Sequence, residues 1–244
     1  MHLKHSFTSE AELKEKLDFI YSQSKKGKYF HGILEVAFNE VTITTAIHNI
    51  KANKGAKTPG VDNNKIDKCL QMKKDELIKL IQKQVRNYKP RLVKRIYIKK
   101  SNGKLRPLGI PTILERIIQE CIRIVIEPIV EAKFFPNSFG FRPYRATKHA
   151  VMDIVSKVNV NSKVKPTYII EGDIKSFFDN INHRILLKKL WKMGVRDKKI
   201  LAILKKMLEA GYLEENSFYS TEMGTVQGGV ISPLLANVYL NDFD

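Results

Sequence analysis

The chain has 244 residues, 43% of them hydrophobic, which is enough to bury a core in one sizeable domain or two small ones. Its 43 Lys and Arg residues against 25 Asp and Glu residues give a net charge of +18, which favours an anionic partner such as nucleic acid phosphates. The chain has two cysteines and no C-x-x-C pair, which argues against a disulfide framework and a structural zinc site. Its polar N-terminus argues against a signal peptide, and the charges that interrupt its apolar stretches argue against a membrane span.

The N-terminal third of the chain is predicted to be helical. In residues 9–24, Leu13, Leu17 and Ile20 recur at spacings of three and four, and Ser9 is available as the N-cap. Turn-forming glycines and a proline then separate two further helical patterns. The second helix, the loop and the third helix are predicted over residues 41–52, 53–62 and 73–87.

A basic β-hairpin is predicted next. Residues 92–100 alternate between two faces, and a turn leads to a second strand at 105–110. Residues 51–100 hold 16 Lys or Arg against four Asp or Glu. Such cations suit a phosphate backbone or a triphosphate, and a solvated edge kept soluble by lysines is an equal alternative on the hairpin alone. The hairpin cations are Lys94, Arg95, Lys99, Lys100, Lys104 and Arg106.

Helices and loops alternate in the second half of the chain. Residues 112–133 predict a long helix that Pro128 should bend or end. Asn182 is expected to cap another helix, and Ser232 and Pro233 are expected to cap and open the last one. The remaining predicted elements are helices at 145–158 and 196–209, a hairpin-like stretch at 211–221, a glycine-rich loop at 224–232 and a final helix at 234–240.

Two segments could carry chemistry. Residues 168–173 predict a strand ending in Asp173, whose carboxylate could hold Mg²⁺ for phosphoryl transfer or satisfy backbone N–H groups. The glycine-rich loop could bring its backbone and Gln227 close to a ligand or form an ordinary tight turn. The sequence lacks the motifs of other reaction classes, and the scattered histidines, His149 and His183 among them, are expected to pack or face solvent.

In their order along the chain, five segments resemble the successive sequence blocks of reverse transcriptases of the group II intron type. The resemblance implies an α+β fold that contains the fingers and part of the palm of a right-hand polymerase. It also implies an N-terminal helical extension at 1–40, fingers at 41–165 and a partial palm at 166–244. The matching segments are residues 53–62, 104–112, 139–145, 173–179 and 224–235.

The resemblance further implies an RNA-directed DNA polymerase that adds dNTPs to a primer 3′-hydroxyl with two Mg²⁺ ions. Asp173 would be a catalytic, metal-binding aspartate, and the carbonyl of Ile174 would be a second ligand of the same ion. Phe178 would lie under the sugar of the incoming nucleotide, and Gln227 would lie beside the nucleotide and the template. The triphosphate would contact Lys99 and Arg106.

The implied partners are intron or template RNA, a DNA primer or target, and a dNTP, with a homodimer left open. No membrane partner is expected, and the implied location is the cytoplasm, or an organelle matrix if the protein is organelle-encoded. A nonenzymatic, RNA-binding maturase that assists splicing is the alternative function, and a decayed gene remnant is a third interpretation. The residues expected to bind RNA are Lys54, Lys57, Lys94, Arg95, Lys100 and Arg142.

The sequence departs from the family pattern at two places. Val226 stands where the family usually has proline. The Tyr-Ala-Asp-Asp block, expected after the glycine-rich loop, does not occur before residue 244. Because a two-metal site needs carboxylates from both palm blocks, we expect an incomplete site and little or no polymerisation by this chain alone.

Overall fold

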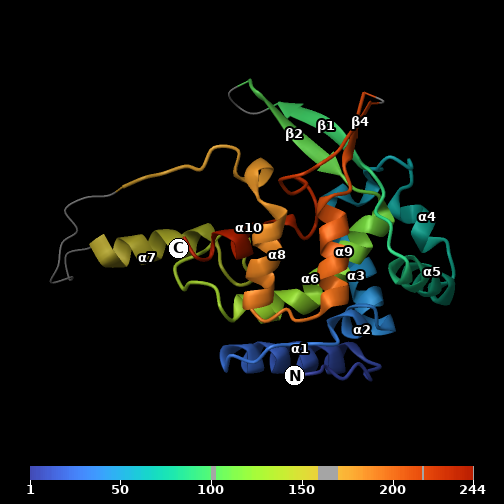
Figure 1. Cartoon of the computed structure of the whole chain (residues 1–244), viewed down its shortest axis with the longest axis horizontal. Helices are drawn as coiled ribbons and strands as arrows, with labels where there is room; N and C mark the ends of the chain where they lie inside the picture. The colour runs from blue at the N-terminus through green and yellow to red at the C-terminus, as the bar shows by residue number, and fades with distance from the viewer. Residues whose placement is uncertain (100–102, 159–169, 216, 244) are drawn as a thin grey trace.

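A computed structural model describes residues 1–99, 103–158, 170–215 and 217–243 (Figure 1). These ranges do not include Lys100. They also leave out residues 101–102 of the predicted hairpin turn and residues 168–169 of the predicted strand. The described residues form a mixed α+β structure, which confirms the predicted fold class. None of the helices in the described ranges has both the length and the apolarity that a membrane span requires.

Helix α6 (Ile113–Glu131) lies at the centre of the molecule, surrounded by other helices (Figure 1). Its N-cap is Thr112, whose side chain accepts a hydrogen bond from the Glu115 N–H. Ile117, Ile122 and Ile126 are fully buried, because α6 is apolar on several sides and packs against helices on each. Its neighbours are α1 (Glu10–Lys25), α2 (Ile33–Ala37), α3 (Glu40–Ala52), α5 (Lys74–Arg86) and α10 (Ser232–Leu240).

The long helices agree with the sequence-based predictions. Ser9 caps α1 by accepting from the Glu12 N–H, and Asn182 caps α8 (His183–Lys192) by accepting from the Ile185 N–H. The predicted helices at 145–158 and 196–209 correspond to α7 (Thr147–Val158) and α9 (Lys198–Leu208). Sequence periodicity did not indicate four short elements, since one turn is too short to repeat a pattern. These are α2, η1 (Lys54–Lys57), α4 (Ile66–Leu70) and η2 (Phe177–Asn180).

Pro128 was predicted to bend or end its helix. It does not end the helix, because α6 continues to Glu131. Proline removes one hydrogen bond of the helical ladder. Ile129 and Val130 immediately after it are both 0% exposed. Burial of this last turn in the core therefore outweighs the lost hydrogen bond.

Two other local predictions are also corrected. Residues 170–173 are not in a strand, and Ile170 is 95% exposed, because no described strand lies beside this segment to pair with its backbone. The N-cap of α10 is Ile231, and Ser232 and Pro233 lie inside the first turn. Ser232 is buried against the glycine-rich loop, so its place is set by packing and not by capping.

Four strands form one sheet in the order β2-β1-β3-β4. The predicted hairpin is confirmed as β1 (Val93–Lys99) antiparallel to β2 (Leu105–Ile110), with Ile98 opposite Arg106 and Tyr97 opposite Pro107. The hairpin-like stretch is confirmed as β3 (Tyr212–Glu214) and β4 (Ser217–Tyr219), and β3 pairs in parallel with the start of β1. Because opposed residues share a face, Lys94 and Arg106 lie on one face and Arg95 on the other.

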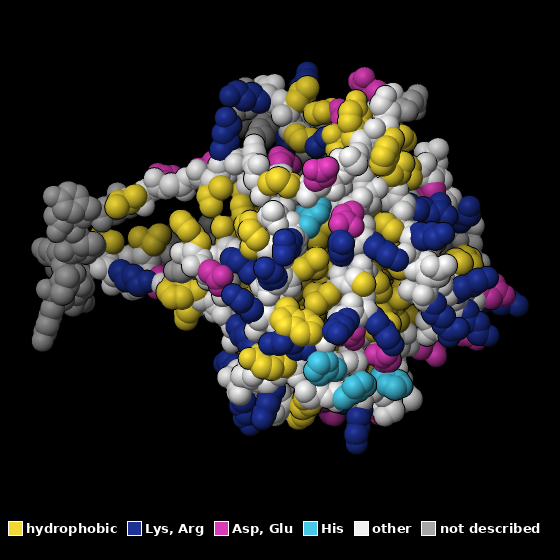
Figure 2. Space-filling view, viewed as in Figure 1, with side chains coloured by type: hydrophobic (Ala, Val, Ile, Leu, Met, Phe, Trp, Pro, Cys, Tyr) yellow, Lys and Arg dark blue, Asp and Glu magenta, His cyan; other side chains and the backbone are white. Residues whose placement is uncertain are grey.

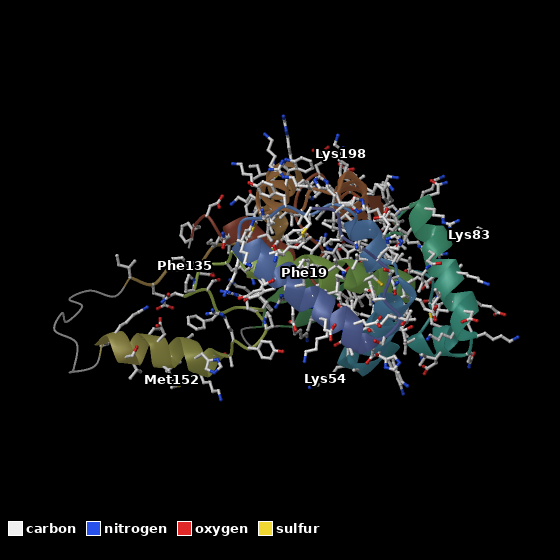
Figure 3. The ribbon with its side chains drawn as sticks, turned by 90° about the horizontal axis from the view of Figure 1, so that it is seen from below. Phe19, Lys54, Lys83, Phe135, Met152 and Lys198 are labelled. Carbon is white, nitrogen blue, oxygen red and sulfur yellow. The ribbon has the colours of Figure 1, made fainter. Side chains whose placement is uncertain are left out.

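Helix α7 extends away from the body of the molecule, and Met152 on it is far from the other helices (Figures 1 and 3). None of its residues is buried. By contrast, the hydrophobic core is shared along the chain, from Leu3 in the N-terminal segment to Val238 in α10. The predicted domain boundaries at residues 40 and 165 therefore stay predictions.

The segment from residue 53 to residue 62 is held on the body by Arg116 of α6. The buried Arg116 guanidinium donates to the carbonyls of Pro111 at 2.9 Å, Gly55 at 2.9 Å and Thr58 at 2.7 Å. Gly60 packs so closely that an added Cβ would lie 2.8 Å from the backbone of Thr112. One side chain therefore connects the beginning of α6 to the segment that matches the N-terminal block.

Replacing Arg116 with Met should keep the aliphatic packing and remove all three hydrogen bonds to the main chain. Charge-assisted hydrogen bonds contribute about 1.5–3 kcal/mol each and are not additive, so we expect a loss of roughly 3–5 kcal/mol in the free energy of unfolding. Urea denaturation measures the loss, and hydrogen exchange should accelerate over residues 53–62. The exposed Arg86→Met serves as the control; an Arg116→Met protein as stable as this control would contradict the anchoring role.

Candidate active site

A cavity of about 610 Å³ opens between β2, the segment 173–179 and the glycine-rich loop. These three segments are far apart in the sequence and meet at the upper part of the molecule in Figure 1. The cavity brings together five of the six residues predicted to bind metal or nucleotide. They are Arg106, Asp173, Ile174, Phe178 and Gln227.

The sixth residue, Lys99, lies in an adjoining concavity of about 560 Å³. This second concavity is also lined by Arg106, Phe178 and Gln227, so the two hollows share a wall. The adjoining surfaces of the two hollows thus carry the exposed cations Lys99 and Arg106 and the Asp173 carboxylate. Such an arrangement can accept a phosphate-bearing ligand and a cation together.

A chain of hydrogen bonds orients Gln227 across the cavity. The Nε of Arg106 donates to Oε1 of Gln227 at 3.1 Å. Nε2 of Gln227 in turn donates to both carboxylate oxygens of Asp179 at 3.2 and 3.3 Å. Sequence reasoning missed this role of Asp179 because a contact between positions 179 and 227 leaves no local pattern. The three side chains join β2, the segment 173–179 and the glycine-rich loop.

The backbone of the glycine-rich loop is fixed on both sides of the cavity. On the side of β2, the Gly109 N–H donates to the Gln227 carbonyl at 2.6 Å. On the side of segment 173–179, the Thr225 N–H donates to the Phe178 carbonyl at 2.8 Å. His183, which is buried, hydrogen-bonds through Nε2 to the Gly224 carbonyl at 2.7 Å, in agreement with the packing role expected for it. The position of Gln227 is therefore set by its own main chain as well as by its side chain.

Asp173 has the properties of a metal ligand, but few other metal-ligating side chains lie near it. Its side chain is exposed, and no described residue pairs with its carboxylate. Ile174 beside it is 47% exposed. The described residues contain no group of three or more His, Cys, Asp or Glu side chains that could hold a metal ion. One carboxylate with a neighbouring carbonyl fits Mg²⁺ only in part, since this ion takes few protein oxygens and completes its shell with phosphates and water.

The backbone before Phe178 adopts a conformation that non-glycine residues rarely use. Ser176 has a φ of 50° and precedes η2. Its carbonyl accepts from the Asp179 N–H at 3.0 Å and from Nδ2 of Asn180 at 2.9 Å. Such left-handed residues are held by their surroundings and are frequent at functional sites. Here the turn directs Phe178 and Asp179 toward the glycine-rich loop.

The residues predicted to bind RNA are not gathered in one place. Lys54 and Lys57 are exposed on η1, and Figure 3 shows Lys54 at the edge of the molecule. Lys94 is half-buried, and Lys100 lies outside the described residues. Arg95 stacks on Tyr212, with its guanidinium carbon 3.9 Å from the ring centroid, and forms an ion pair with Glu214 at 3.7 Å. Arg95 is therefore partly neutralised by the sheet itself.

Arg142 is corrected from an RNA contact to a structural residue. Its guanidinium donates to the Glu131 carboxylate at 2.7 Å and to the carbonyls of Phe135 and Ser138, each at 2.7 Å. Only 3% of its side chain is exposed. These bonds hold the loop after α6 in place, and the burial of the guanidinium keeps it away from an RNA phosphate at the surface.

One titratable group of the basic hairpin has a shifted pKa. The Tyr97 hydroxyl donates a hydrogen bond to the Glu214 carboxylate, and this bond is the main reason that the pKa of Tyr97 is raised. The contact ties the basic hairpin to β3. It lies on the face of β1 opposite to Arg106 and so supports the sheet from behind.

Replacing Gly228 with Ala should displace the glycine-rich loop. Gly228 has a φ of +109°, and an added Cβ would lie 2.5 Å from the Gly109 carbonyl oxygen. We expect a loss of roughly 1–3 kcal/mol in the free energy of unfolding, measured by urea denaturation. Gly27→Ala is the matched control, because Gly27 also has a positive φ of +76° but no atom within 4 Å of an added Cβ. Equal losses in the two proteins would mean that the close approach is unimportant.

Comparison with known proteins agrees with this geometry. The model of the family described as "Reverse transcriptase (RNA-dependent DNA polymerase)" matches residues 98–244. The "Group II intron-encoded protein LtrA" of Lactococcus lactis subsp. cremoris is 40% identical over 200 residues, which are 82% of this chain and 32% of that protein. "Protein YkfC" of Escherichia coli (strain K12) is 40% identical over 202 residues, 79% of this chain and 51% of that protein. The chain thus spans about half, or about a third, of the length of these relatives.

A solved structure shares the fold. A chain of the "Cas6-RT-Cas1--Cas2 complex" superposes with a TM-score of 0.50 at 21% identity, over 83% of this chain and 20% of that chain. The family match covers more than half of the chain and includes the segments that line the cavity. It confirms the resemblance seen in the sequence blocks. The chain therefore belongs to the reverse transcriptase (RNA-dependent DNA polymerase) family, and it is similar to group II intron-encoded proteins.

Proposed function

We propose that this chain provides the fingers and the first part of the palm of an RNA-directed DNA polymerase. The observation that carries this proposal is the cavity in which Arg106, Asp173, Phe178 and Gln227 converge from three distant segments. The reaction is attack of a primer 3′-hydroxyl on the α-phosphate of a dNTP, with pyrophosphate as the leaving group. A nucleic acid template and a primer are its macromolecular partners.

Each residue of the cavity has a role in this proposal. Arg106 and Lys99 neutralise the triphosphate, which Arg can bind in a bidentate manner. Phe178 lies under the nucleotide sugar and leaves no room for a 2′-hydroxyl. Gln227, oriented by its bonds to Arg106 and Asp179, presents a fixed amide to the nucleotide and template. Because the binding groups are already oriented, little ordering is needed when the nucleotide enters.

Asp173 and the Ile174 carbonyl would hold Mg²⁺ in this site. The chemistry that bound Mg²⁺ supplies is charge neutralisation of the entering and leaving oxygens. Asp173 is suited to it because its carboxylate is exposed in the cavity and pairs with no described residue. Asp179 is less suited, since its carboxylate already accepts from Gln227.

The first prediction for this function concerns Asp173. In a protein extended to the length of its relatives, Asp173→Asn should lower primer extension on an RNA template by roughly a hundredfold or more, because a neutral amide is a poor Mg²⁺ ligand. Affinity for the template should stay the same. Asp67→Asn, an exposed aspartate on α4 outside the cavity, is the control. Undiminished synthesis by Asp173→Asn would rule out its metal role.

RNA binding without synthesis is the second candidate function, and two observations favour it. The cavity contains only two carboxylates, Asp173 and Asp179, and no larger group of metal-ligating side chains lies among the described residues. The chain also carries a net charge of +18, and the exposed Lys54 and Lys57 form no ion pair with any described residue. We therefore propose that this chain alone binds RNA and adds few or no nucleotides.

The double variant Lys54→Gln, Lys57→Gln tests this RNA contact. Each phosphate contact contributes roughly 0.7–0.9 to the slope of log affinity against log salt, so the slope should fall by about 1.4–1.8. Fluorescence anisotropy with a labelled RNA between about 50 and 200 mM salt measures it. The double variant Lys4→Gln, Lys14→Gln removes the same charge from exposed positions at the other end of the molecule. If both variants behave alike, the 53–62 segment is not an RNA contact.

A further inference from the structure

A groove of about 940 Å³ runs between α8 and α9, outside the proposed active site. Arg184, Lys188, Trp191 and Lys192 line it from α8. Their spacings of four, three and one place them on one side of the helix. Figure 2 shows this face of the molecule, where Lys and Arg side chains surround hydrophobic ones over α8 and α9. The groove is therefore basic, with an aromatic ring near one end.

The three cations that α8 contributes to this groove are not neutralised by the described residues. The side chains of Arg184, Lys188 and Lys192 form no ion pair or hydrogen bond with any other described residue. Like charges four residues apart on a helix repel each other, so α8 is less stable with this spacing than with alternating charges. Of the two acids in the groove, Glu209 pairs with Lys205 at 3.7 Å, which leaves Glu222 at the far end from Trp191. An external anion would relieve this repulsion.

A second group of cations lies beside Trp191, at the end of the groove that we call the lower end. The Arg196 guanidinium carbon lies 4.4 Å from the ring centroid of Trp191 and 4.4 Å from that of Tyr29. Its Nε is buried without a hydrogen-bond partner, and no described acid faces it. The Nζ of Lys133 also lies over the Tyr29 ring, 5.5 Å from its centroid. Burial, together with Arg196 nearby, lowers the pKa of Lys133.

The length of α8 separates the Trp191 end of this surface from the cavity. The segment that holds Phe178 and Asp179 leads into the N-terminus of α8, whereas Trp191 and Arg196 follow at its C-terminal end. A helix of 10 residues is about 15 Å long. A ligand in the lower groove would thus leave the cavity free for a nucleotide.

We propose that the groove between α8 and α9 is a second nucleic-acid-binding surface that holds a phosphodiester backbone. Arg184, Lys188 and Lys192 span about 12 Å along α8, the axial length over which one strand of a double helix carries three or four phosphates at about 3.4 Å each. Arginine and aromatic rings at the lower end suit the ribose and base edges next to that backbone. This surface goes beyond the proposed function, since it would let the chain hold one nucleic acid segment while another occupies the cavity.

The test is the triple variant Arg184→Gln, Lys188→Gln, Lys192→Gln in the full 244-residue chain. Loss of three phosphate contacts should reduce affinity for a hairpin RNA at least about tenfold at 150 mM salt and lower the salt slope by about 2–3. The charge-retaining triple Arg184→Lys, Lys188→Arg, Lys192→Arg should restore both. Circular dichroism checks that each protein is folded. The measurement needs no synthesis, so a failure of the polymerase proposal would not affect it.

A matched control removes three charges elsewhere. It is the triple variant Lys4→Gln, Lys14→Gln, Lys16→Gln. These three lysines lie in the N-terminal segment and α1, away from the groove. Duplex DNA of the same sequence as the RNA hairpin stem distinguishes the two sources of phosphate. A selective loss with RNA, with DNA or with both supports the groove and names its ligand. Equal losses in the groove and control variants, or unchanged binding in both, would overturn the proposal.

Discussion

The polar residues of the buried helix α6 are the constraint on which the rest of this structure depends. A helix buried on several sides must satisfy each polar side chain inside the protein, because an unpaired buried group costs about 1–3 kcal/mol or more. Glu115 accepts from the Tyr88 hydroxyl at 2.5 Å, and Glu120 accepts from Asn49 at 2.7 Å. Burial raises the pKa of Glu115 because it disfavours the charged form, and the hydrogen bond from Tyr88 acts in the opposite direction. Each bond fixes a different neighbouring segment.

Two more residues of α6 extend the same constraint to the cavity. Arg116 holds the carbonyls of residues 55 and 58, and the Gln119 side chain accepts from the Val230 N–H at 2.9 Å. One helix therefore positions both the N-terminal block and the glycine-rich loop. The loop then reaches β2 through the contact between Gly109 and Gln227. The segment 53–62 and the glycine-rich loop share a framework because α6 connects them.

The distribution of charge matches the three tasks proposed for this basic chain. Arg106 shares the cavity with the unpaired carboxylate of Asp173, and Lys99 lines the adjoining concavity, which suits a nucleotide with a metal ion. Lys54 and Lys57 lie on a segment anchored by Arg116, which suits a template or intron RNA. The groove along α8 has its own cations and its own aromatic ring. Other arginines are internal, and Arg142 and Arg116 stabilise loops through several hydrogen bonds to main-chain carbonyls. A net charge alone does not distinguish these uses.

The sequence by itself determined the features that depend on neighbours along the chain. Helix caps such as Ser9 and Asn182, the two faces of the hairpin and the order of the family blocks are local patterns, and all were predictable. Asp173, Phe178 and Gln227 could be named from those blocks, although nothing local showed that they share a cavity.

Tertiary structure alone decided the features that depend on burial and on partners far away in the chain. The continuation of α6 past Pro128, the internal role of Arg142 and the lack of a strand at 170–173 each follow from which groups lie nearby in space. The bond between Asp179 and Gln227 joins positions 48 residues apart. The free energy of a side chain depends on its solvent exposure and on the donors and acceptors around it, and folding sets both at long range.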